Sequence, residues 1–317
     1  MNASPTRSRS FGRRALTAVL LGLLAGAGPA FAGEQPPASA AAPRSIRAEE
    51  ARSADGIGYR RLHWQEGAEA GSIHLVTVDP RRYVVRLALP LKQSVGGYPL
   101  PRYLYEQQAL VAFTGSYLTT FLPATPRGLV KVDDTLRSNA VEGVEFARIV
   151  DGIVCFAEAG SPAVTRRQTT SSSRTAPLPA ILVAPFAGEG QYDAYPSCLQ
   201  GGPLLVENGG QRAVDWEAVD QVGKRFASGL FTRAFVAETG DGQVVLGIAD
   251  PIPLQMLAWS LTEGMRGLGA DGLAIKSALN LTGRNTAGLI GTVLGLDAAP
   301  LGTVDTLLPN AIIVSRP

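Results

Sequence analysis

The sequence has few of the residues on which disulfide scaffolds, zinc sites and highly charged interaction proteins depend. Its 317 residues include two cysteines, two histidines and 18% charged side chains. Two cysteines are too few for a disulfide-built scaffold, and a hydrophobic content of 45% excludes disorder throughout. A formal net charge of +2 gives no strongly basic face of the kind that binds nucleic acid. We therefore expect a folded, loop-rich protein with a sizeable core and no nucleic-acid partner.

The motifs of several common enzyme classes are missing as well. The chain contains no His-Glu-x-x-His, no Cys-x-x-Cys, no Walker phosphate loop and no Gly-x-Ser-x-Gly elbow. These absences remove the usual support for zinc, nucleotide-hydrolysis and serine-hydrolase chemistry. The histidines, His63 and His74, are interpreted as structural or exposed. We expect no metal and no cofactor.

The first 32 residues have the three parts of an export signal. Four arginines precede an apolar run over 15–27, and Ala30-Phe31-Ala32 forms a small-residue cleavage site. The run is short for a bilayer span, which takes about 20 residues. We expect cleavage near Ala32, export to the periplasm or the medium, and no transmembrane segment in the mature chain. The pair Arg13-Arg14 leaves both general secretion and twin-arginine export open.

After the leader, composition and periodicity predict a linker followed by one domain. Residues 33–57 are rich in Pro and Ala and predict a disordered linker, and residues 58–317 predict a single folded domain. Strand patterns on either side of short turns predict three hairpins. These pair 72–78 with 83–89, 146–150 with 153–157, and 232–237 with 243–249; further strands are predicted at 109–113, 181–185, 203–207 and 272–275.

Two segments predict helices, at 101–108 and 253–268. Each begins at or near a proline, and the second has leucine and methionine at helical spacing. Together the elements predict an α+β fold with a mixed, largely antiparallel β-sheet and a few flanking helices. Export also permits a disulfide between Cys155 and Cys198, because compartments outside the cytoplasm are oxidising. Two buried free thiols remain the alternative.

Four segments carry recognisable motif patterns. Residues 199–210 read LQGGPLLVENGG, close to Q-x-G-P-x-L-V-x-x-G, and residues 225–250 place Arg233 in a strand before a hairpin. The helix from Pro253 ends in Leu-Gly-Ala before another strand, and residues 109–118 read ALVAFTGSYL. In this order the segments resemble the phosphodiester glycosidase domain family, which includes the lysosomal uncovering enzyme and exported bacterial proteins, some of them tied to exopolysaccharide.

The resemblance covers about residues 58–293 and implies both a fold and a ligand class. It implies an exported hydrolase that acts on sugar-1-phosphodiesters or related envelope glycans, with a carbohydrate or sugar-phosphate ligand. The matching positions give the expected substrate-binding residues: Thr114, Gly115, Ser116, Gly201, Gly202, Arg233, Thr282 and Gly283. Of these, Arg233 suits a phosphate held by two parallel hydrogen bonds; a structural ion pair is the alternative.

Two motif positions depart from the family pattern. Thr114 stands where the family has the Asn of N-G-G-F-F. The Asp of L-D-G-G-x-S is also absent, and its place is taken by Lys276 or by Thr282, depending on the alignment. A rebuilt acid–base pair would have to come from other carboxylates, with Glu158, Asp193, Asp250 and Asp271 as candidates. We select Asp250 and Asp271 as the catalytic pair.

Two functions of different classes follow. A working hydrolase needs an acid and a second carboxylate about 5 to 9.5 Å apart around the scissile bond, and this is the interpretation we favour. A glycan- or phosphosugar-binding pseudoenzyme needs only the pocket and Arg233. The oligomeric state is left open by the sequence.

Overall fold

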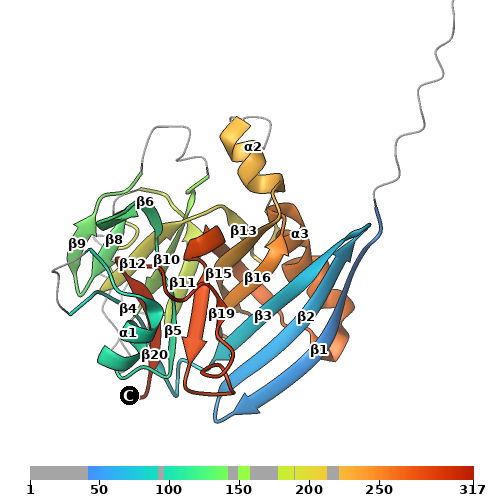
Figure 1. Ribbon diagram of the computed structural model, residues 1–317, viewed down its shortest axis with the longest axis horizontal. Coiled ribbons are helices and arrows are strands. Elements are labelled where there is room, and N and C mark those ends of the chain that lie inside the picture. Colours follow the sequence, from blue (N-terminus) through green and yellow to red (C-terminus); the bar gives the residue numbers. More distant parts are fainter. Residues whose placement is uncertain (1–41, 92–95, 142–148, 158–177, 189, 213–220) are drawn as a thin grey trace, which may run out of the picture. The chain divides into compact units, whose positions relative to one another are not determined.

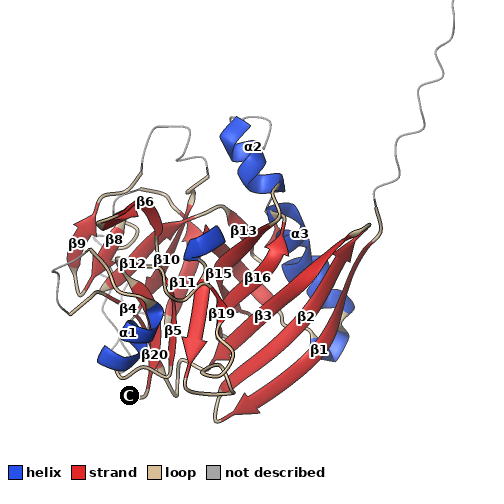
Figure 2. Ribbon diagram, viewed as in Figure 1, coloured by secondary structure: helices blue, strands red, loops and turns tan. Residues whose placement is uncertain are grey.

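The computed structural model describes residues 42–317 except 92–95, 142–148, 158–177, 189 and 213–220 (Figure 1). The predicted leader and the first part of the predicted linker lie outside these residues. From Ala42 to Pro317 the chain forms one compact unit. It consists mostly of strands, with short helices beside them (Figure 2).

An eight-stranded antiparallel sheet is the largest element of the fold. Its order is β1-β2-β3-β16-β15-β17-β13-β14, and β1, β2 and β3 run side by side as its longest strands (Figure 1). The hairpin predicted at 232–237 and 243–249 is confirmed as β15 and β16. The bounds are β1 (Arg44–Ala54), β2 (Ile57–Glu66), β3 (Glu69–Val78), β13 (Leu204–Glu207), β14 (Gly210–Gln211), β15 (Phe231–Thr239), β16 (Val244–Ile252) and β17 (Ile275–Gly283).

Strand β1 corrects the predicted linker over 33–57. It pairs with β2 along its whole length, with one bulge between Ala48 and Glu50. Most of its side chains are exposed, and Ile46 packs against the core as a partly buried residue. A charged, exposed strand at a sheet edge discourages pairing with other chains. The polar composition of this segment therefore belongs to an edge strand and not to a disordered linker.

Two five-stranded sheets and one two-stranded ribbon complete the strand framework. Their orders are β11-β10-β12-β8-β9, β19-β18-β5-β20-β4 and β6-β7. Every described strand pair is antiparallel, which confirms the largely antiparallel character predicted from the sequence; the parallel pairs of a mixed sheet are not found among the described strands. The bounds are β4 (Val84–Ala88), β5 (Val111–Thr114), β6 (Tyr117–Phe121), β7 (Ala124–Arg127), β8 (Val130–Val132), β9 (Thr135–Ser138), β10 (Gly152–Phe156), β11 (Ile181–Pro185), β12 (Ser197–Gly201), β18 (Gly288–Gly291), β19 (Leu301–Gly302) and β20 (Ala311–Ser315).

One predicted hairpin does not form, and the first strand of a second lies partly outside the described residues. The strands predicted at 72–78 and 83–89 lie in different sheets, because β3 pairs with β2 and β16 whereas β4 pairs with β20. Val76 and Leu87 belong to the same buried cluster, so the two strands pack across the core instead of pairing edge to edge. Strand β10 pairs with β11 and β12. Its predicted partner at 146–150 lies partly outside the described residues and has no strand over 149–150.

The hydrophobic core has two main layers on the large sheet. One layer lies between the sheets and includes Val76, Val154, Val236 and Ile312. The other covers the opposite face of the large sheet, where Phe235 and the helical segment after β16 meet. Strands of the large sheet are therefore buried on both faces in their central part. Arg233 and Asn280, polar residues on β15 and β17, are fully buried as a result.

The helices are α1 (Leu100–Glu106), α2 (Gln221–Ser228), α3 (Leu254–Trp259) and α4 (Met265–Gly267). The helix predicted at 253–268 is confirmed, because α3 continues into α4 through a π-helical turn over Ser260–Gly264, and the expected apolar stripe is buried. The strand predicted from 272 begins instead at Ile275. Among the described helices none has the length and apolar character that crossing a membrane takes.

Candidate functional site

The motif segments meet at one end of the large sheet. Strand β15 begins there, and β17 ends there, with Arg233 opposite Gly283. The Gly202–Pro203 segment joins the same end, because the Gly202 N–H donates to the Asn280 carbonyl at 2.7 Å and the Asn280 N–H donates to the Pro203 carbonyl at 3.1 Å. Tyr117, at the start of β6, donates its hydroxyl proton to the Gly202 carbonyl at 2.6 Å. Four segments that are far apart in the sequence therefore share one cluster.

Arg233 lies at the centre of this cluster and is 0% exposed. Its Nε donates to the Ile252 carbonyl at 3.3 Å, and its Nη2 donates to the carbonyls of Phe226 and, at 3.1 Å, of Gly229. The guanidinium carbon lies 4.5 Å from the ring centroid of Phe226 and 5.1 Å from that of Phe231. Nη1 is buried and has no hydrogen-bond partner within the described part of the chain.

The Arg233 charge has no carboxylate in contact over the described residues. Burial lowers the pKa of Arg233 to about 10, and the nearby charge of Arg284 acts in the same direction. The guanidinium therefore stays protonated at neutral pH. Among the described residues, neutral carbonyls and aromatic rings are the groups that stabilise it, and none of these residues forms the ion pair considered as its alternative role.

Asn280 and Tyr117 form a second buried polar group next to Arg233. The Asn280 side chain donates through Nδ2 to the Tyr117 hydroxyl at 2.5 Å and to the Gly202 carbonyl at 2.8 Å. Its Oδ1 is buried without a partner among the residues that the structure describes. Burial raises the pKa of Tyr117 well above its usual value, whereas the Arg233 charge acts to lower it. Tyr117 is thus a neutral hydroxyl at any pH near neutrality.

The threonines of the expected site form hydrogen bonds at the carboxyl end of β17 and in the turn that follows it. Thr114 donates to the Thr286 carbonyl at 2.6 Å, and the hydroxyls of Thr282 and Thr286 are 2.6 Å apart. Thr282 therefore lies at the site end of β17. Lys276, the other position proposed for the missing Asp, lies at the opposite end of the strand with its Nζ 2.9 Å from Glu238.

Gly115 and Ser116 pack against Asn310, which follows the turn before β20. The Ser116 N–H donates to Asn310 Oδ1 at 2.9 Å, and Asn310 Nδ2 donates to Ser116 Oγ at 2.8 Å. A Cβ at Gly115 would lie 1.9 Å from Asn310 Oδ1, so only glycine fits this position. Asn310 also lines a pocket of about 180 Å³, whose other lining residues are mainly apolar and include Arg137.

The two selected carboxylates are far from each other in the fold. Asp250 is exposed near the carboxyl end of β16, where it accepts a 2.6 Å hydrogen bond from Thr232. Asp271 is exposed in the 3-10 turn Gly269–Asp271, which precedes the amino end of β17. Strands β16 and β17 both pair antiparallel with β15 and so run parallel to each other. Asp250 and Asp271 therefore lie at opposite ends of the sheet and do not form a pair.

The remaining candidate acids do not replace this pair. Asp193 is exposed in a turn before β12, and Glu158 lies outside the described residues. Asp151, which lies in the turn expected between the strands at 146–150 and 153–157, is closer to the site. Its Oδ1 accepts the Leu204 N–H at 2.8 Å, and its Oδ2 is 3.4 Å from Arg212 Nη2. Burial raises the pKa of Asp151 above its ordinary value, and the Arg212 charge offsets part of that rise.

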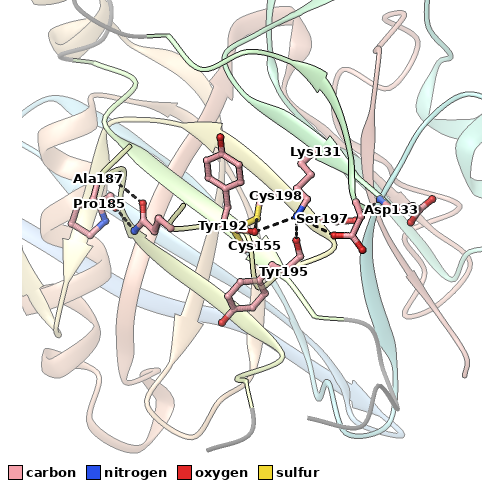
Figure 3. Close-up of a disulfide and its surroundings, with 11 residues drawn as sticks. Lys131, Asp133, Cys155, Pro185, Ala187, Tyr192, Tyr195, Ser197 and Cys198 are labelled. Carbon is pink, nitrogen blue, oxygen red and sulfur yellow. Dashed lines mark hydrogen bonds and ion pairs between the residues drawn. A yellow bond between two sulfur atoms is a disulfide. The ribbon is translucent and has the colours of Figure 1, made fainter. Parts of the chain in front are cut away.

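A disulfide joins β10 to β12, the strand that leads into the Gly201–Gly202 segment (Figure 3). Cys155 on β10 and Cys198 on β12 are directly opposite each other and fully buried. Beside them, Lys131 donates to the Tyr195 carbonyl at 2.7 Å and pairs with Asp134 at 3.0 Å. Of the two alternatives for the cysteines, the structure has the bridge. No group of three His, Cys, Asp or Glu side chains in the described ranges could hold a metal ion.

Comparison with known proteins shows the fold and no family. No protein-family model and no curated protein sequence matches the chain. Among solved structures, the catalytic domain of zebrafish N-acetylglucosamine-1-phosphodiester α-N-acetylglucosaminidase, auto-inhibited by its pro-peptide, is similar, with a TM-score of 0.58 and 14% identity over 86% of this chain and 88% of that one.

Two further structures have the same arrangement. A hypothetical protein from Synechocystis matches with a TM-score of 0.58 and 14% identity over 87% of this chain and 68% of its own length. A protein from Burkholderia pseudomallei, named as a presumed exported protein, matches with a TM-score of 0.54 and 11% identity over 86% of this chain and 96% of that one. At these identities the likeness shows the fold alone. The chain thus has a fold that is also found in a phosphodiester glycosidase.

Proposed function

We propose that this chain is an exported protein that binds a sugar phosphate of the cell envelope through Arg233. One observation carries the proposal: Arg233 is fully buried, has no carboxylate in contact over the described residues, and keeps Nη1 without a hydrogen-bond partner there. A buried charge is unfavourable unless it is paired and hydrogen-bonded. An anion at Nη1 would supply the missing partner, and phosphate oxygens suit the planar donors of a guanidinium.

The surroundings of Arg233 fit a sugar next to the anion. The Tyr117 hydroxyl and the buried amide of Asn280 are neutral polar groups of the kind that hydrogen-bond sugar hydroxyls. Gly283, opposite Arg233 in the sheet, places no side chain against the guanidinium, since a Cβ there would lie 3.5 Å from Nη1. The predicted leader and the buried disulfide support export, and the likeness to a phosphodiester glycosidase supports the ligand class.

Binding without turnover is favoured over hydrolysis because the two carboxylates selected from the sequence are not brought together in the described part of the chain. Asp250 and Asp271 lie at opposite ends of the sheet, and of the two positions considered for the missing Asp, Lys276 and Thr282, neither holds a carboxylate. A threonine hydroxyl cannot take the place of the carboxylate that stabilises an oxocarbenium ion or activates water. Positioned acid–base groups contribute about 10²- to 10⁴-fold in rate.

Calorimetric titration of the purified protein with glucose 1-phosphate tests the binding. We expect Arg233→Met to weaken binding by about 10- to 100-fold, because hydrogen bonds to charged groups contribute about 1.5–3 kcal/mol. Gly283→Ala places a methyl group 3.5 Å from Nη1 and 2.9 Å from the Thr232 carbonyl oxygen, and it should weaken binding without removing the charge. Arg316→Gln, which removes an exposed charge beyond β20, is the matched control. Folded Arg233→Met and Gly283→Ala proteins that bind as the wild type does would overturn the proposal, as would a wild type that does not bind.

Hydrolysis is the second candidate, and Asp151 is the observation that favours it. Its carboxyl is held beside the Gly202–Leu204 segment with a raised pKa, as expected of a residue that donates a proton to a leaving oxygen. Release of free sugar from a sugar-1-phosphodiester measures this activity. Asp151→Asn keeps the acceptor for the Leu204 N–H but cannot release the proton. Turnover by the wild type that is lost in this variant selects hydrolysis. Binding by the wild type without any turnover selects the binding function proposed above.

A further inference from the structure

A second arginine lies at the same site and is not explained by the fold. Arg284 follows β17 directly and has a φ of 61°, a left-handed conformation that few non-glycine residues adopt. Its side chain is exposed, and its guanidinium carbon lies 4.1 Å from the ring centroid of Phe231. The chain thus has a long cationic side chain at a position where glycine would adopt the same positive φ without backbone strain.

Arg233 and Arg284 approach the same aromatic ring. Their guanidinium carbons lie 5.1 and 4.1 Å from the Phe231 centroid, so they are separated by no more than the sum of these distances. Neither side chain forms an ion pair with a described residue, and the Arg284 charge lowers the pKa of Arg233. Two like charges this close repel each other, and the repulsion is relieved by an anion that both can reach.

The charge of the ligand follows from the number of cations. A phosphodiester carries one negative charge, whereas a phosphomonoester carries about −1.5 to −2 at neutral pH and offers three acceptor oxygens. Arg233 alone, through Nη1, matches a single negative charge. The additional, exposed guanidinium of Arg284 matches the second charge and the further oxygens of a terminal phosphate.

We propose that Arg284 is the second cation of the Arg233 site and makes it select phosphate dianions, as in a sugar 1-phosphate or a terminal diphosphate, over phosphodiesters. This inference rests on the proposed function and names its ligand class. Arg284 is a specificity-determining residue of the site. The ligand that fits is therefore a free phosphorylated sugar, such as the product of a reaction that cleaves a sugar-1-phosphodiester on the aglycone side of the phosphate.

Titration with two probes that differ by one methyl group tests the selection. The probes are glucose 1-phosphate and its methyl phosphodiester, and the proteins are the wild type, Arg284→Gly and the control Arg316→Gln. We expect the wild type and the control to prefer the monoester by about 10- to 100-fold. Arg284→Gly should lose this preference and bind the diester as the wild type does. The glycine suits the positive φ, so we expect this variant to be at least as stable as the wild type.

The pH dependence provides a readout that a structural role of Arg284 would not move. The second ionisation of a phosphomonoester has a pKa of about 6, so the monoester preference of the wild type should fall between pH 7.5 and 5.5, and that of Arg284→Gly should stay flat. A preference that survives in Arg284→Gly overturns this inference and leaves the Arg233 proposal standing. If the wild type binds neither probe, the proposed function itself fails.

Discussion

Phe226 holds the Arg233 guanidinium with both its ring and its backbone. The guanidinium carbon lies 4.5 Å from the ring centroid, and the Phe226 carbonyl accepts a hydrogen bond from Nη2. The same ring meets Tyr117 edge-on, at 6.2 Å between centroids. Helix α2, which carries Phe226, therefore connects Arg233 to Tyr117, the hydrogen-bond partner of Asn280.

We expect Phe226→Leu to weaken glucose 1-phosphate binding by about two- to fivefold, because a cation–π contact contributes about 0.5–1 kcal/mol. The backbone acceptor remains, so the variant tests the ring alone. Phe121→Leu, at an exposed position in β6 that is 50% accessible, is the matched control. Calorimetric titration measures both. Equal affinity of Phe226→Leu and the wild type would show that the ring does not position the charge.

An aspartate at Thr282, one of the two positions considered for the aspartate of the glycosidase motif, should destabilise the protein. Thr286 donates its one hydroxyl proton to the Gly283 carbonyl at 2.8 Å, so Thr282 donates to Thr286. A carboxylate in this place has no proton to donate, and Thr282 is 2% exposed. We expect Thr282→Asp to lower the free energy of unfolding by about 1–3 kcal/mol.

Urea unfolding measures the Thr282→Asp effect, and Thr282→Ser, which keeps the hydroxyl donor, is its control. A Thr282→Asp protein as stable as the wild type would mean that the site accepts the missing carboxylate. Turnover of a sugar-1-phosphodiester by that variant would then be the informative measurement.

Removing the disulfide should lower stability but leave the site intact. Cys155 and Cys198 are separated by 43 residues; a bridge typically stabilises by about 2–4 kcal/mol, in the chain-entropy account by restricting the unfolded chain. We expect the double variant Cys155→Ala, Cys198→Ala to have a free energy of unfolding in urea that is lower by about that amount. The pairing of β10 with β12 is made by backbone groups and does not need the bridge, so the affinity for glucose 1-phosphate should persist. Loss of binding in a folded double variant would place the bridge among the determinants of the site.

His74 should make the protein less stable in mild acid. Burial is the largest cause that lowers the pKa of His74 in the folded protein, and Arg61 acts in the same direction. Its Nδ1 lies 2.9 Å from the Tyr59 hydroxyl. Because the folded pKa is depressed, the unfolded chain binds more protons as the pH falls below about 6.5. The free energy of unfolding therefore decreases from that pH down to the folded pKa.

Urea unfolding of the wild type and of His74→Gln at pH 7.5 and 5.0 isolates this contribution from that of Asp151, whose raised pKa acts with the opposite sign. We expect a smaller loss at pH 5.0 in His74→Gln than in the wild type. His63→Gln is the control. Equal losses in the two proteins would exclude His74 as the cause.

Local patterns in the sequence were sufficient for some elements and not for others. The β15–β16 hairpin and the helix after Pro253 depend on a glycine turn and on helical spacing, both of which are local. Strand β4 pairs with β20 near the chain's end, and nothing close to β4 in the sequence indicates that partner. Strand β1 was missed because an exposed edge strand has the composition of a linker.

The site was predicted in part, for the same reason. Arg233 and the glycines near it were found through motif positions, and the structure gathers them at one end of the sheet. Asp151 was assigned to a hairpin turn, and only its burial next to Leu204 sets it apart. Arg284 was missed because its contact is with Phe231, on a neighbouring strand, and no spacing rule connects the two residues.

A crystal structure of the protein with glucose 1-phosphate tests the central claim most directly. The account predicts a phosphate oxygen at hydrogen-bond distance, about 2.7–3.2 Å, from Arg233 Nη1, with the sugar toward Tyr117 and Asn280. A phosphate seated instead in the pocket of about 180 Å³ beside Asn310, with Arg233 Nη1 still without an anion at saturating ligand, would contradict it.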